Sequence, residues 1–381
     1  MSPPIRLGVI GLSSSGWAAT SLIPPLFDPL LSDKYTITAV ATRSETSAQA
    51  SATKYSELTG HKVKGYYGEN GAKDLANDSE VDLVVVSVKI PDHWKAVKPA
   101  IDAGKDIFVE WSPGRSLEET AKMAEAAKAK GVRTIVGAQS SHSATIRKMK
   151  ELVDSGKVGK VISTNLVRTS LVLPSVLKFI GKTSTEDSAY ALDINNDATL
   201  LTILTGHHLT NLSYILGELK EVSATTAILF PNVQIVDANG KATGEIIKKT
   251  APDQVILTGT LGGRHDGAIV TVHIQAGAAT GRFLWFIDGE DGVIEVKNRP
   301  ENGPQGVFVG FNEMKLLLNN EEVGLDQREE DRLRNTGKAW LEFAKGDKGQ
   351  YETLEHSVVV WRVLDAAFKS IADGGRKIAV A

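Results

Sequence analysis

The sequence predicts an α/β protein with an N-terminal doubly wound parallel sheet and a C-terminal α+β domain whose large open sheet is mostly antiparallel. Three observations predict it. An apolar segment from Ile5 runs directly into a loop of small residues. Over the first third of the chain, strand-like and helix-like segments alternate, as in a parallel sheet covered on both faces. Beyond residue 220, alternating segments follow one another as in antiparallel sheets.

The length of 381 residues predicts two domains, which we place at 1–140 and 141–381. In the first we expect a six-stranded sheet, because apolar runs alternate with helical patterns up to residue 140. Strands are expected from residue 5 and at 35–41, 81–88, 106–110 and 132–138, with helices at 47–58, 91–103 and 117–130. Gly104 and Gly131 follow the last two helices, where glycine commonly ends a helix.

The second domain has a different pattern, with long alternating segments and fewer helices. We expect a helix at 143–155, a strand at 161–170, an irregular stretch rich in Pro, Gly and Ser, and a helix at 200–216. Strands are expected at 222–229, 254–261, 268–276 and 283–288, and a long amphipathic helix at 353–372.

Composition limits the classes of function. The net charge is −3 without long basic or acidic runs, which argues against nucleic acid or an anionic membrane as a partner. There is no cysteine, which excludes disulfides, thiolate metal sites and a cysteine nucleophile. The first residues lack the apolar core of a signal peptide, and no apolar run reaches about 18 residues. We therefore expect a cytoplasmic protein.

The loop after the first strand has the spacing of a dinucleotide-binding fingerprint, GxGxxG. Gly11, Ser13 and Gly16 occupy its three positions, with Ser14, Ser15 and Trp17 beside them. Gly11 permits the tight turn, the middle position lets the backbone approach a pyrophosphate, and Gly16 permits close packing of the next helix. Serine replaces the middle glycine, but its hydroxyl can donate to a phosphate oxygen. The loop predicts a Rossmann domain that binds a dinucleotide.

The end of the second strand predicts which dinucleotide is bound. An acidic residue there would bind the ribose 2′-hydroxyl of NAD, but this chain has Thr42, Arg43 and Ser44. A guanidinium flanked by hydroxyls suits a 2′-phosphate, so we expect NADP in preference to NAD. The alternative is that Arg43 is an ordinary solvated loop residue.

Several segments resemble the glucose-fructose oxidoreductase and inositol dehydrogenase (Gfo/Idh/MocA) family over almost the whole chain. They are the segments 88–93 (VKIPDH), 108–113 (FVEWSP), 144–161 and 206–211 (GHHLTN). Within the family, the Gly-Leu-Ser loop and the Val-Glu-Trp segment are most similar to the fungal galactose-regulon repressors, which bind a dinucleotide without catalysis. The resemblance implies that Val88, Lys89, His93, Glu110 and Trp111 lie near the dinucleotide.

Two departures from the family pattern bear on catalysis. The family lysine beside the nicotinamide is replaced by Trp111, whose indole donates one hydrogen bond and does not titrate near neutral pH. The family aspartate four residues before the histidine is replaced by Leu204, whereas the histidine itself remains as His208. His208 is either a general acid/base with a pKa near the working pH or a structurally satisfied histidine.

Other residues are candidates to supply the chemistry. Tyr190 and Asp193 precede the His208 helix, and either could relay a proton. Asp193 and Asn195 are alternatively helix caps. Lys89 follows a parallel strand where a ligand crevice forms, although a solvated loop lysine is the alternative. His142 and Arg168 are further residues that could face a substrate. The adjacent His207 and His208 diverge by about 100° on a helix, so no metal site is predicted.

Two functions follow from these residues. The first is an NAD(P)-dependent oxidoreductase that acts on a sugar, polyol or related hydroxyl or carbonyl compound with a non-standard proton relay. The second is a non-enzymatic, dinucleotide-binding, repressor-like regulator with a protein partner. In either case we expect a homo-oligomer, because the strands at 268–276 and 283–288 carry alternating apolar residues that could form an open apolar sheet face.

Overall fold

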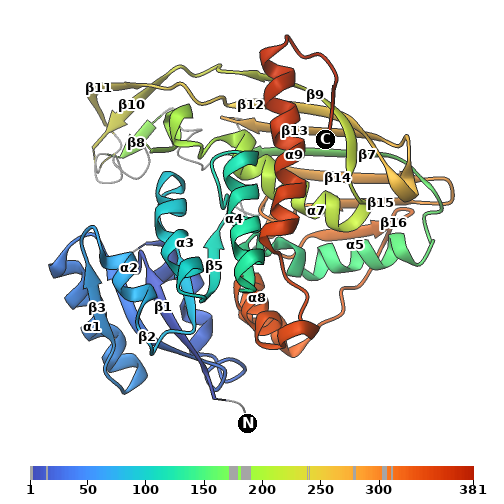
Figure 1. Ribbon diagram of the computed structural model, residues 1–381. Coiled ribbons are helices and arrows are strands. Elements are labelled where there is room, and N and C mark those ends of the chain that lie inside the picture. The colour runs from blue at the N-terminus through green and yellow to red at the C-terminus, as the bar shows by residue number, and fades with distance from the viewer. Residues whose placement is uncertain are drawn as a thin grey trace. The chain divides into compact units, whose positions relative to one another are not determined.

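The chain forms two compact units in a computed structural model (Figure 1). The structure describes residues 3–13, 16–170, 179–181, 190–237, 239, 241–277, 280–302, 307–309 and 312–381. The first unit comprises Met1–Gln139 and Arg328–Val358, and the second comprises Ser140–Gln327 and Val359–Ala381. The segment 328–358 thus packs with the first unit, although the sequence places it in the second domain.

The first unit is built on a parallel sheet of six strands in the order β3-β2-β1-β4-β5-β6 (Figure 1). The strands are β1 Ile5–Ile10, β2 Tyr35–Thr42, β3 Lys64–Tyr67, β4 Leu83–Val86, β5 Asp106–Glu110 and β6 Thr134–Gly137. This order is that of the doubly wound dinucleotide-binding fold, so the predicted fold class is confirmed. The edge strand β3 was not located from the sequence, because its Lys-Gly-Tyr-Tyr has no buried residue.

The helices of the first unit begin and end largely where the sequence predicts. They are α1 Glu45–Thr59, α2 Gly71–Ala76, α3 His93–Asp102 and α4 Leu117–Lys130. The Ser116 side chain accepts from the Glu119 amide at the start of α4, and Gly131 ends it in a left-handed conformation. After the fingerprint loop, however, only a π-helical turn, Ala18–Leu22, and a 3₁₀ turn, Pro24–Phe27, follow. Two consecutive prolines prevent a regular helix there, since they lack backbone N–H donors.

Helix α8 (Arg334–Ala344) explains why the segment 328–358 belongs to the first unit. Its Trp340 is fully buried and stacks on Phe108 of β5 with ring centroids 4.8 Å apart. The Trp340 indole donates to the Leu22 carbonyl at 3.0 Å, and the Tyr35 hydroxyl donates to the Trp340 carbonyl at 2.6 Å. Trp340 therefore completes the core of the parallel-sheet unit, although it lies far along the chain from Gly137, where the last strand of that unit ends.

The second unit contains a nine-stranded sheet in the order β17-β16-β15-β14-β7-β13-β12-β9-β18 (Figure 1). The strands are β7 Val161–Ser170, β9 Leu219–Ala227, β12 Gln254–Leu261, β13 Ile269–Ala276, β14 Arg282–Gly289, β15 Val293–Lys297, β16 Lys315–Leu318, β17 Glu321–Glu322 and β18 Ile378–Ala379. Only the β7–β13 pair among these described strands is parallel, so the predicted mostly antiparallel sheet is confirmed.

The strands β13 and β14 place different side chains on the core face and on the open face of this sheet. The alternating apolar residues of β13 and β14 are buried in the core: Val270, Val272, Ile274, Phe283, Trp285 and Ile287. The opposite, half-buried face carries Thr271, His273 and Gln275 on β13, and Leu284 and Phe286 on β14. The alternating apolar residues at these positions therefore point into the core, because alternate residues of a strand point to opposite faces. The opposite face also carries the exposed Ile269 of β13 and Ile256 of β12, so the apolar open face and the homo-oligomer stay predictions.

Helices α5 (Ala144–Asp154) and α7 (Gly206–Leu216) pack against each other in this unit, and the long α9 spans Leu354–Ala372. The predicted helix 200–216 exists, but its first part, Leu200–Thr205, is a π-helix that continues into α7. Thr199 caps it, because its side chain accepts from the Thr202 amide. Residues 182–189 and most of 171–181, in the predicted irregular stretch, lie outside the described residues.

A small sheet in the second unit is anchored by a buried ion pair. The sheet contains β8 (Phe179–Gly181), β10 (Asn232–Val236) and β11 (Ala242–Lys248). Lys249 Nζ lies 2.7 Å from Asp253, and both side chains are fully buried. Asp253 also accepts the amides of Leu229 and Phe230. Burial raises the pKa of Asp253, but Lys249 and the two amides outweigh it, so the net pKa is lowered.

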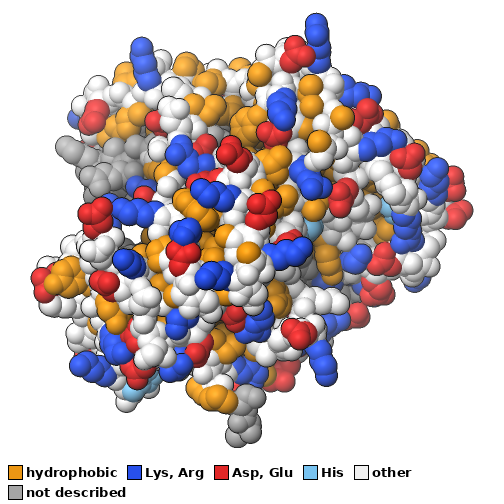
Figure 2. All heavy atoms as spheres, in the orientation of Figure 1, with side chains coloured by type: hydrophobic (Ala, Val, Ile, Leu, Met, Phe, Trp, Pro, Cys, Tyr) orange, Lys and Arg blue, Asp and Glu red, His pale blue; other side chains and the backbone are white. Residues whose placement is uncertain are grey.

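The surface gives no sign of one dominant charge on the face that Figure 2 shows, where acidic and basic side chains are interspersed. Among the helices of the described residues, none combines the length and apolar character needed to cross a membrane.

Candidate functional site

The predicted cofactor-binding residues of the first unit lie at one edge of the parallel sheet. They lie at or after the carboxyl ends of β1, β2, β4 and β5, which are consecutive in the sheet order β2-β1-β4-β5. These described residues are Gly11, Ser13, Gly16, Trp17, Thr42, Arg43, Ser44, Val88, Lys89, His93, Glu110 and Trp111. Ser14 and Ser15 lie outside the described residues. In open α/β sheets this edge is where ligands bind.

The fingerprint loop requires glycine at Gly11. Its φ is +90°, and a Cβ placed there would lie 2.1 Å from the Ser87 carbonyl oxygen at the end of β4. Ser13 Oγ accepts from the Gly16 amide at 3.1 Å, so the serine that replaces the middle glycine braces the loop. A Cβ on Gly16 would lie 3.0 Å from this Oγ. Glycine is therefore favoured at this position by the close approach of Ser13, and not by the predicted helix packing.

The residues after β2 leave a cation available for a ligand. Thr42 Oγ1 donates to the Ser44 carbonyl at 3.0 Å, and Ser44 Oγ caps α1 by accepting from the Ser47 amide. Between them Arg43 is exposed and makes no hydrogen bond or ion pair with any residue that the structure describes. An exposed guanidinium can pair in bidentate fashion with a phosphate.

His93 connects two loops at the same edge. Its Nδ1 lies 2.9 Å from the Ser112 carbonyl oxygen and its Nε2 lies 3.1 Å from that of Val88. Burial lowers the pKa of His93 despite these carbonyls. A neutral imidazole carries one N–H, so His93 donates to only one of these carbonyls at a time, although its ring lies between the loops that follow β4 and β5. Those two loops would position a dinucleotide at this edge.

Glu110 and Trp17 meet above the end of β5. Trp17 Nε1 donates to Glu110 Oε1 at 2.9 Å. Burial raises the pKa of Glu110 to about 7, although Trp17 and a backbone amide favour its charged form. A Cβ on Gly137 would lie 2.2 Å from Glu110 Oε2, so the neighbouring strand must carry glycine for this carboxyl to fit. Trp111, next to it, is buried with 6% of its surface exposed.

In the second unit the structure brings His208 of α7 together with Arg168 of β7. Arg168 NH1 lies 3.1 Å from His208 Nε2, and both side chains are buried. Because arginine only donates, Nε2 must accept, which places the imidazole proton on Nδ1. Burial and the nearby guanidinium lower the pKa of His208 well below its usual value. These surroundings favour the neutral imidazole, and the general acid/base role of His208 stays a prediction.

Arg168 is a buried cation without an acidic partner among the described residues. Burial lowers its pKa to about 9, so the guanidinium stays charged at neutral pH. The Phe308 ring lies 4.1 Å from it. Removing a charge from water costs several kcal/mol, whereas a cation–π contact and one hydrogen bond recover about 2–4 kcal/mol. The sequence could have indicated the burial, since Arg168 shares its strand phase with the buried Thr164 and Leu166.

Tyr190 and Asp193 hold their own loop together. Asp193 caps a 3₁₀ turn, Ile194–Asn196, by accepting from the Asn195 amide at 3.0 Å, and its pKa is lowered chiefly by this bond. The Tyr190 hydroxyl donates to the Asn196 carbonyl at 3.1 Å. Asp193 is therefore a cap, as the alternative expected, but of the 3₁₀ turn Ile194–Asn196. The following helix is capped by Thr199 instead.

The described residues offer no cluster of metal ligands. Among the described residues no three His, Asp or Glu side chains are placed to hold a metal ion. Burial, followed by the Arg168 charge, lowers the pKa of the adjacent His207 to about 4.

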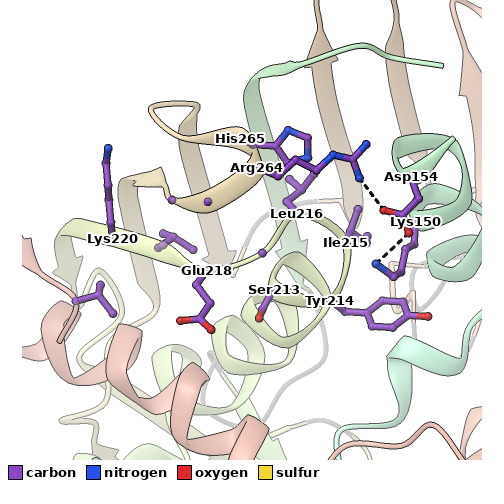
Figure 3. Close-up of a pocket in the computed structure, with 15 residues that line it drawn as sticks. Lys150, Asp154, Ser213, Tyr214, Ile215, Leu216, Glu218, Lys220, Arg264 and His265 are labelled. Atoms are coloured by element: carbon purple, nitrogen blue, oxygen red, sulfur yellow. Dashed lines mark hydrogen bonds and ion pairs between the residues drawn. The ribbon is translucent and has the colours of Figure 1, made fainter. Parts of the chain in front are cut away.

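A pocket of about 660 Å³ opens elsewhere in the second unit, beside the end of α7 (Figure 3). Its main charges are already paired with each other. Asp154 lies 3.2 Å from Lys150 Nζ and 3.1 Å from Arg264 NH1, as the dashed lines of Figure 3 show. None of the predicted site residues lines it.

Comparison with known proteins shows the family to which the chain belongs. Residues 5–138 match the oxidoreductase family with an NAD-binding Rossmann fold, and residues 144–298 match the C-terminal domain of Gal80p. Dehydrogenase aclE of Aspergillus oryzae is 32% identical over 380 residues, which is 98% of each chain. The chain therefore belongs to the Gfo/Idh/MocA oxidoreductase family and carries an NAD(P)-binding Rossmann domain.

The regulatory branch of the family is also similar. The galactose/lactose metabolism regulatory protein GAL80 of Saccharomyces cerevisiae is 28% identical over 271 residues, 68% of this chain and 58% of the regulator. The crystal structure of a super-repressor mutant of Gal80p from the same yeast matches with a TM-score of 0.84 at 22% identity. It covers 99% of this chain and 98% of that chain. This last similarity shows the fold alone.

Proposed function

We propose that this protein is an NADP-dependent oxidoreductase acting on a sugar, polyol or related hydroxyl or carbonyl compound. The observations that carry the proposal lie at one edge of the parallel sheet: a glycine whose Cβ would overlap the Ser87 carbonyl oxygen, and the exposed Arg43, which has no ion-pair partner among the described residues. The full-length similarity to a dehydrogenase supports turnover as well as binding. Arg43 supports NADP, because only NADP carries a 2′-phosphate for a guanidinium to bind.

The chain departs from the family in how it would handle the proton. A bound nicotinamide supplies or accepts the hydride, so the protein has to orient the substrate and stabilise its oxygen. Trp111 cannot exchange a proton near neutral pH. His208 carries its proton on Nδ1 and stays neutral, and a neutral imidazole can donate a hydrogen bond to a carbonyl oxygen without ionising. We assign His208 this role, with the proton that accompanies hydride transfer exchanged with solvent water, and give Tyr190 and Asp193 a structural one.

The test combines binding and turnover. NADP and NAD binding is measured by calorimetry, and NADPH oxidation is followed with a panel of aldehydes and ketosugars. Gly11→Trp should abolish both, and Arg43→Glu, at an exposed position that should not disturb folding, should abolish NADP binding in a chain with unchanged thermal stability. If the natural chain oxidises NADPH no faster than the Gly11→Trp and Arg43→Glu variants, the enzymatic proposal is overturned for that panel.

A repressor-like regulator is the second candidate. The match of residues 144–298 to the Gal80p C-terminal domain favours it, as do Trp111 and Leu204 at two family catalytic positions. NADP binding without turnover of any compound, together with NADP-dependent capture of an acidic peptide, would support this function instead.

A further inference from the structure

The unpaired atoms around Arg168 share one chemical property. Among the described residues of this cluster, the buried side-chain nitrogens without a hydrogen-bond partner are Nε and NH2 of Arg168, Nδ1 of His208 and Nδ2 of Asn211. His208 Nδ1 is a donor because Nε2 accepts from Arg168. Asn211 Nδ2 is a donor because its Oδ1 accepts from Ser140. All four groups are therefore N–H donors, and what the cluster lacks is an acceptor.

The donors of Arg168 have a specific arrangement. NH1 is used by His208, which leaves Nε and NH2, the two nitrogens whose N–H bonds lie parallel along one edge of a guanidinium. Two parallel donors match the two oxygens of one carboxylate. Buried charges are normally paired, and no acidic side chain pairs with Arg168 among the described residues. The missing partner is thus an anion from outside this part of the chain.

His208 and Asn211 extend the same pattern. They lie three residues apart on α7, so they share one face of the helix. Their unpaired N–H groups can donate to hydroxyl or carbonyl oxygens of a ligand whose acid group is held by Arg168. A tetrahedral phosphate fits less well, because its further oxygens and second charge find no additional cation among the described neighbours.

We propose that Arg168 binds the carboxylate of the substrate, so that the compound handled by this protein is a hydroxy acid, oxo acid or sugar acid. This inference rests on the proposed oxidoreductase function and specifies its substrate class. The acid pairs with the Nε–NH2 edge of Arg168, and Nδ1 of His208 and Nδ2 of Asn211 donate to its remaining oxygens. Because these atoms are buried, the acid has to displace surrounding groups on entry, which predicts slow association.

The experiment compares acids with their uncharged amides. Binding of D-glucuronate against D-glucuronamide, and of glycolate and lactate against glycolamide and lactamide, is measured by calorimetry with and without NADP. Inorganic phosphate is the other anionic probe. At least one acid should bind on the order of 100-fold more tightly than its amide, the value of a charge-assisted bidentate contact. Arg168→Met should remove this difference, and Arg168→Lys should reduce it.

Controls separate binding from folding. Arg168→Met replaces a buried, unpaired cation by an apolar side chain, so its thermal stability should equal or exceed that of the natural chain. Arg282→Met, on the exposed start of the neighbouring β14, should leave acid binding unchanged. If Arg168→Met does not fold, the Arg168→Lys chain decides, because it keeps the charge and loses the parallel donors.

The possible outcomes are distinct. Equal binding of every acid and its amide, or tighter binding of phosphate than of any carboxylate, would overturn the carboxylate site. An Arg168→Met chain that retains the preference for acids would do the same. Failure of the natural chain to bind NADP, with acid binding intact, would overturn the oxidoreductase proposal and leave the carboxylate site in place. NADPH oxidation by neutral sugars that is unaffected by Arg168→Met would support the oxidoreductase proposal and overturn the carboxylate site.

Discussion

The Trp17 indole donates to the carboxyl of Glu110 across 93 residues of sequence, at a distance of 2.9 Å. Trp17 follows the fingerprint loop and Glu110 ends β5, so this bond joins two strand ends that border the dinucleotide edge. An indole is a donor only, and it can bind the carboxyl in either protonation state. The contact therefore persists through the titration of Glu110, which burial shifts to a pKa of about 7.

The raised pKa of Glu110 predicts a pH-dependent stability. The folded protein holds the Glu110 proton more tightly than the unfolded chain, whose value is 4.5, so stability falls as pH rises from about 4.5 to about 7 and then levels off. Glu110→Gln removes this loss. We expect its melting temperature at pH 8 to exceed that of the natural chain by about 5 °C, with little difference at pH 4.5. Glu57→Gln, an exposed change on α1, should follow the natural chain at every pH.

Arg43 should determine cofactor preference. Arg43→Ala removes the cation that we assign to the 2′-phosphate, and we expect NADP affinity to fall on the order of 10- to 100-fold while NAD affinity changes less than threefold. Calorimetric titration with both dinucleotides measures this. Arg6→Ala, at an exposed salt bridge with Asp82 where β1 begins, is the control and should change neither affinity. An equal loss for both dinucleotides would show that Arg43 does not discriminate.

Two substitutions at His208 separate its contacts. Gln can present an oxygen near the Nε2 position and still accept from Arg168, whereas Asn can present an amide N–H near the Nδ1 position. If Nδ1–H polarises the substrate oxygen, His208→Gln should fold normally and lower kcat on the order of 100-fold, and His208→Asn should retain more activity. If His208→Gln retains more activity than His208→Asn, the bond between His208 and Arg168 is what matters.

The kcat profile of the natural chain provides an independent check on His208. Because its pKa lies well below the usual value, His208 should contribute no step to the profile between pH 6 and 8. A step in that range that disappears in His208→Gln would show that the histidine titrates during turnover.

The buried ion pair of the second unit should be essential for stability. Asp253→Ala leaves the Lys249 charge and the Leu229 and Phe230 amides buried without their partner, which costs about 3–5 kcal/mol of unfolding free energy. Asp102→Ala removes the exposed partner of Lys98 at the same four-residue spacing and should cost less than about 0.5 kcal/mol. Urea unfolding of both variants gives the comparison, and similar losses would mean that burial of the Lys249 pair is unimportant.

Periodicity predicted the regular elements of this fold well. β5 and α4 occur at the predicted boundaries, because a continuous apolar run and a capped helical pattern leave few alternatives. β3 lacks a buried residue, so no local signal places it at the sheet edge. α8 carries an ordinary amphipathic pattern, so no local signal places it in the first unit. The prolines at 24–25 were the available indication that no regular helix follows the fingerprint loop.

Local sequence predicted the candidate site less completely. The fingerprint glycine Gly11 could be located because its positive φ depends on neighbours in sequence. The Arg168–His208 pair joins residues 40 apart through the packing of α7 on the sheet, and spacing does not determine such a contact. Asp193 and Tyr190 looked chemically active, but their hydrogen bonds within the loop depend on backbone geometry that composition does not reveal.

The position of Trp340 in the first unit also bears on how the protein is made. During synthesis the ribosome releases the parallel-sheet segment long before α8, and Phe108, Tyr35 and Leu22 then lack the indole that contacts them. Most of the first unit's core is therefore made early but lacks Trp340 until α8 emerges, and the second unit waits longer still for its part of α9. A chaperone that shields apolar surface would act on the N-terminal half of the unfinished chain.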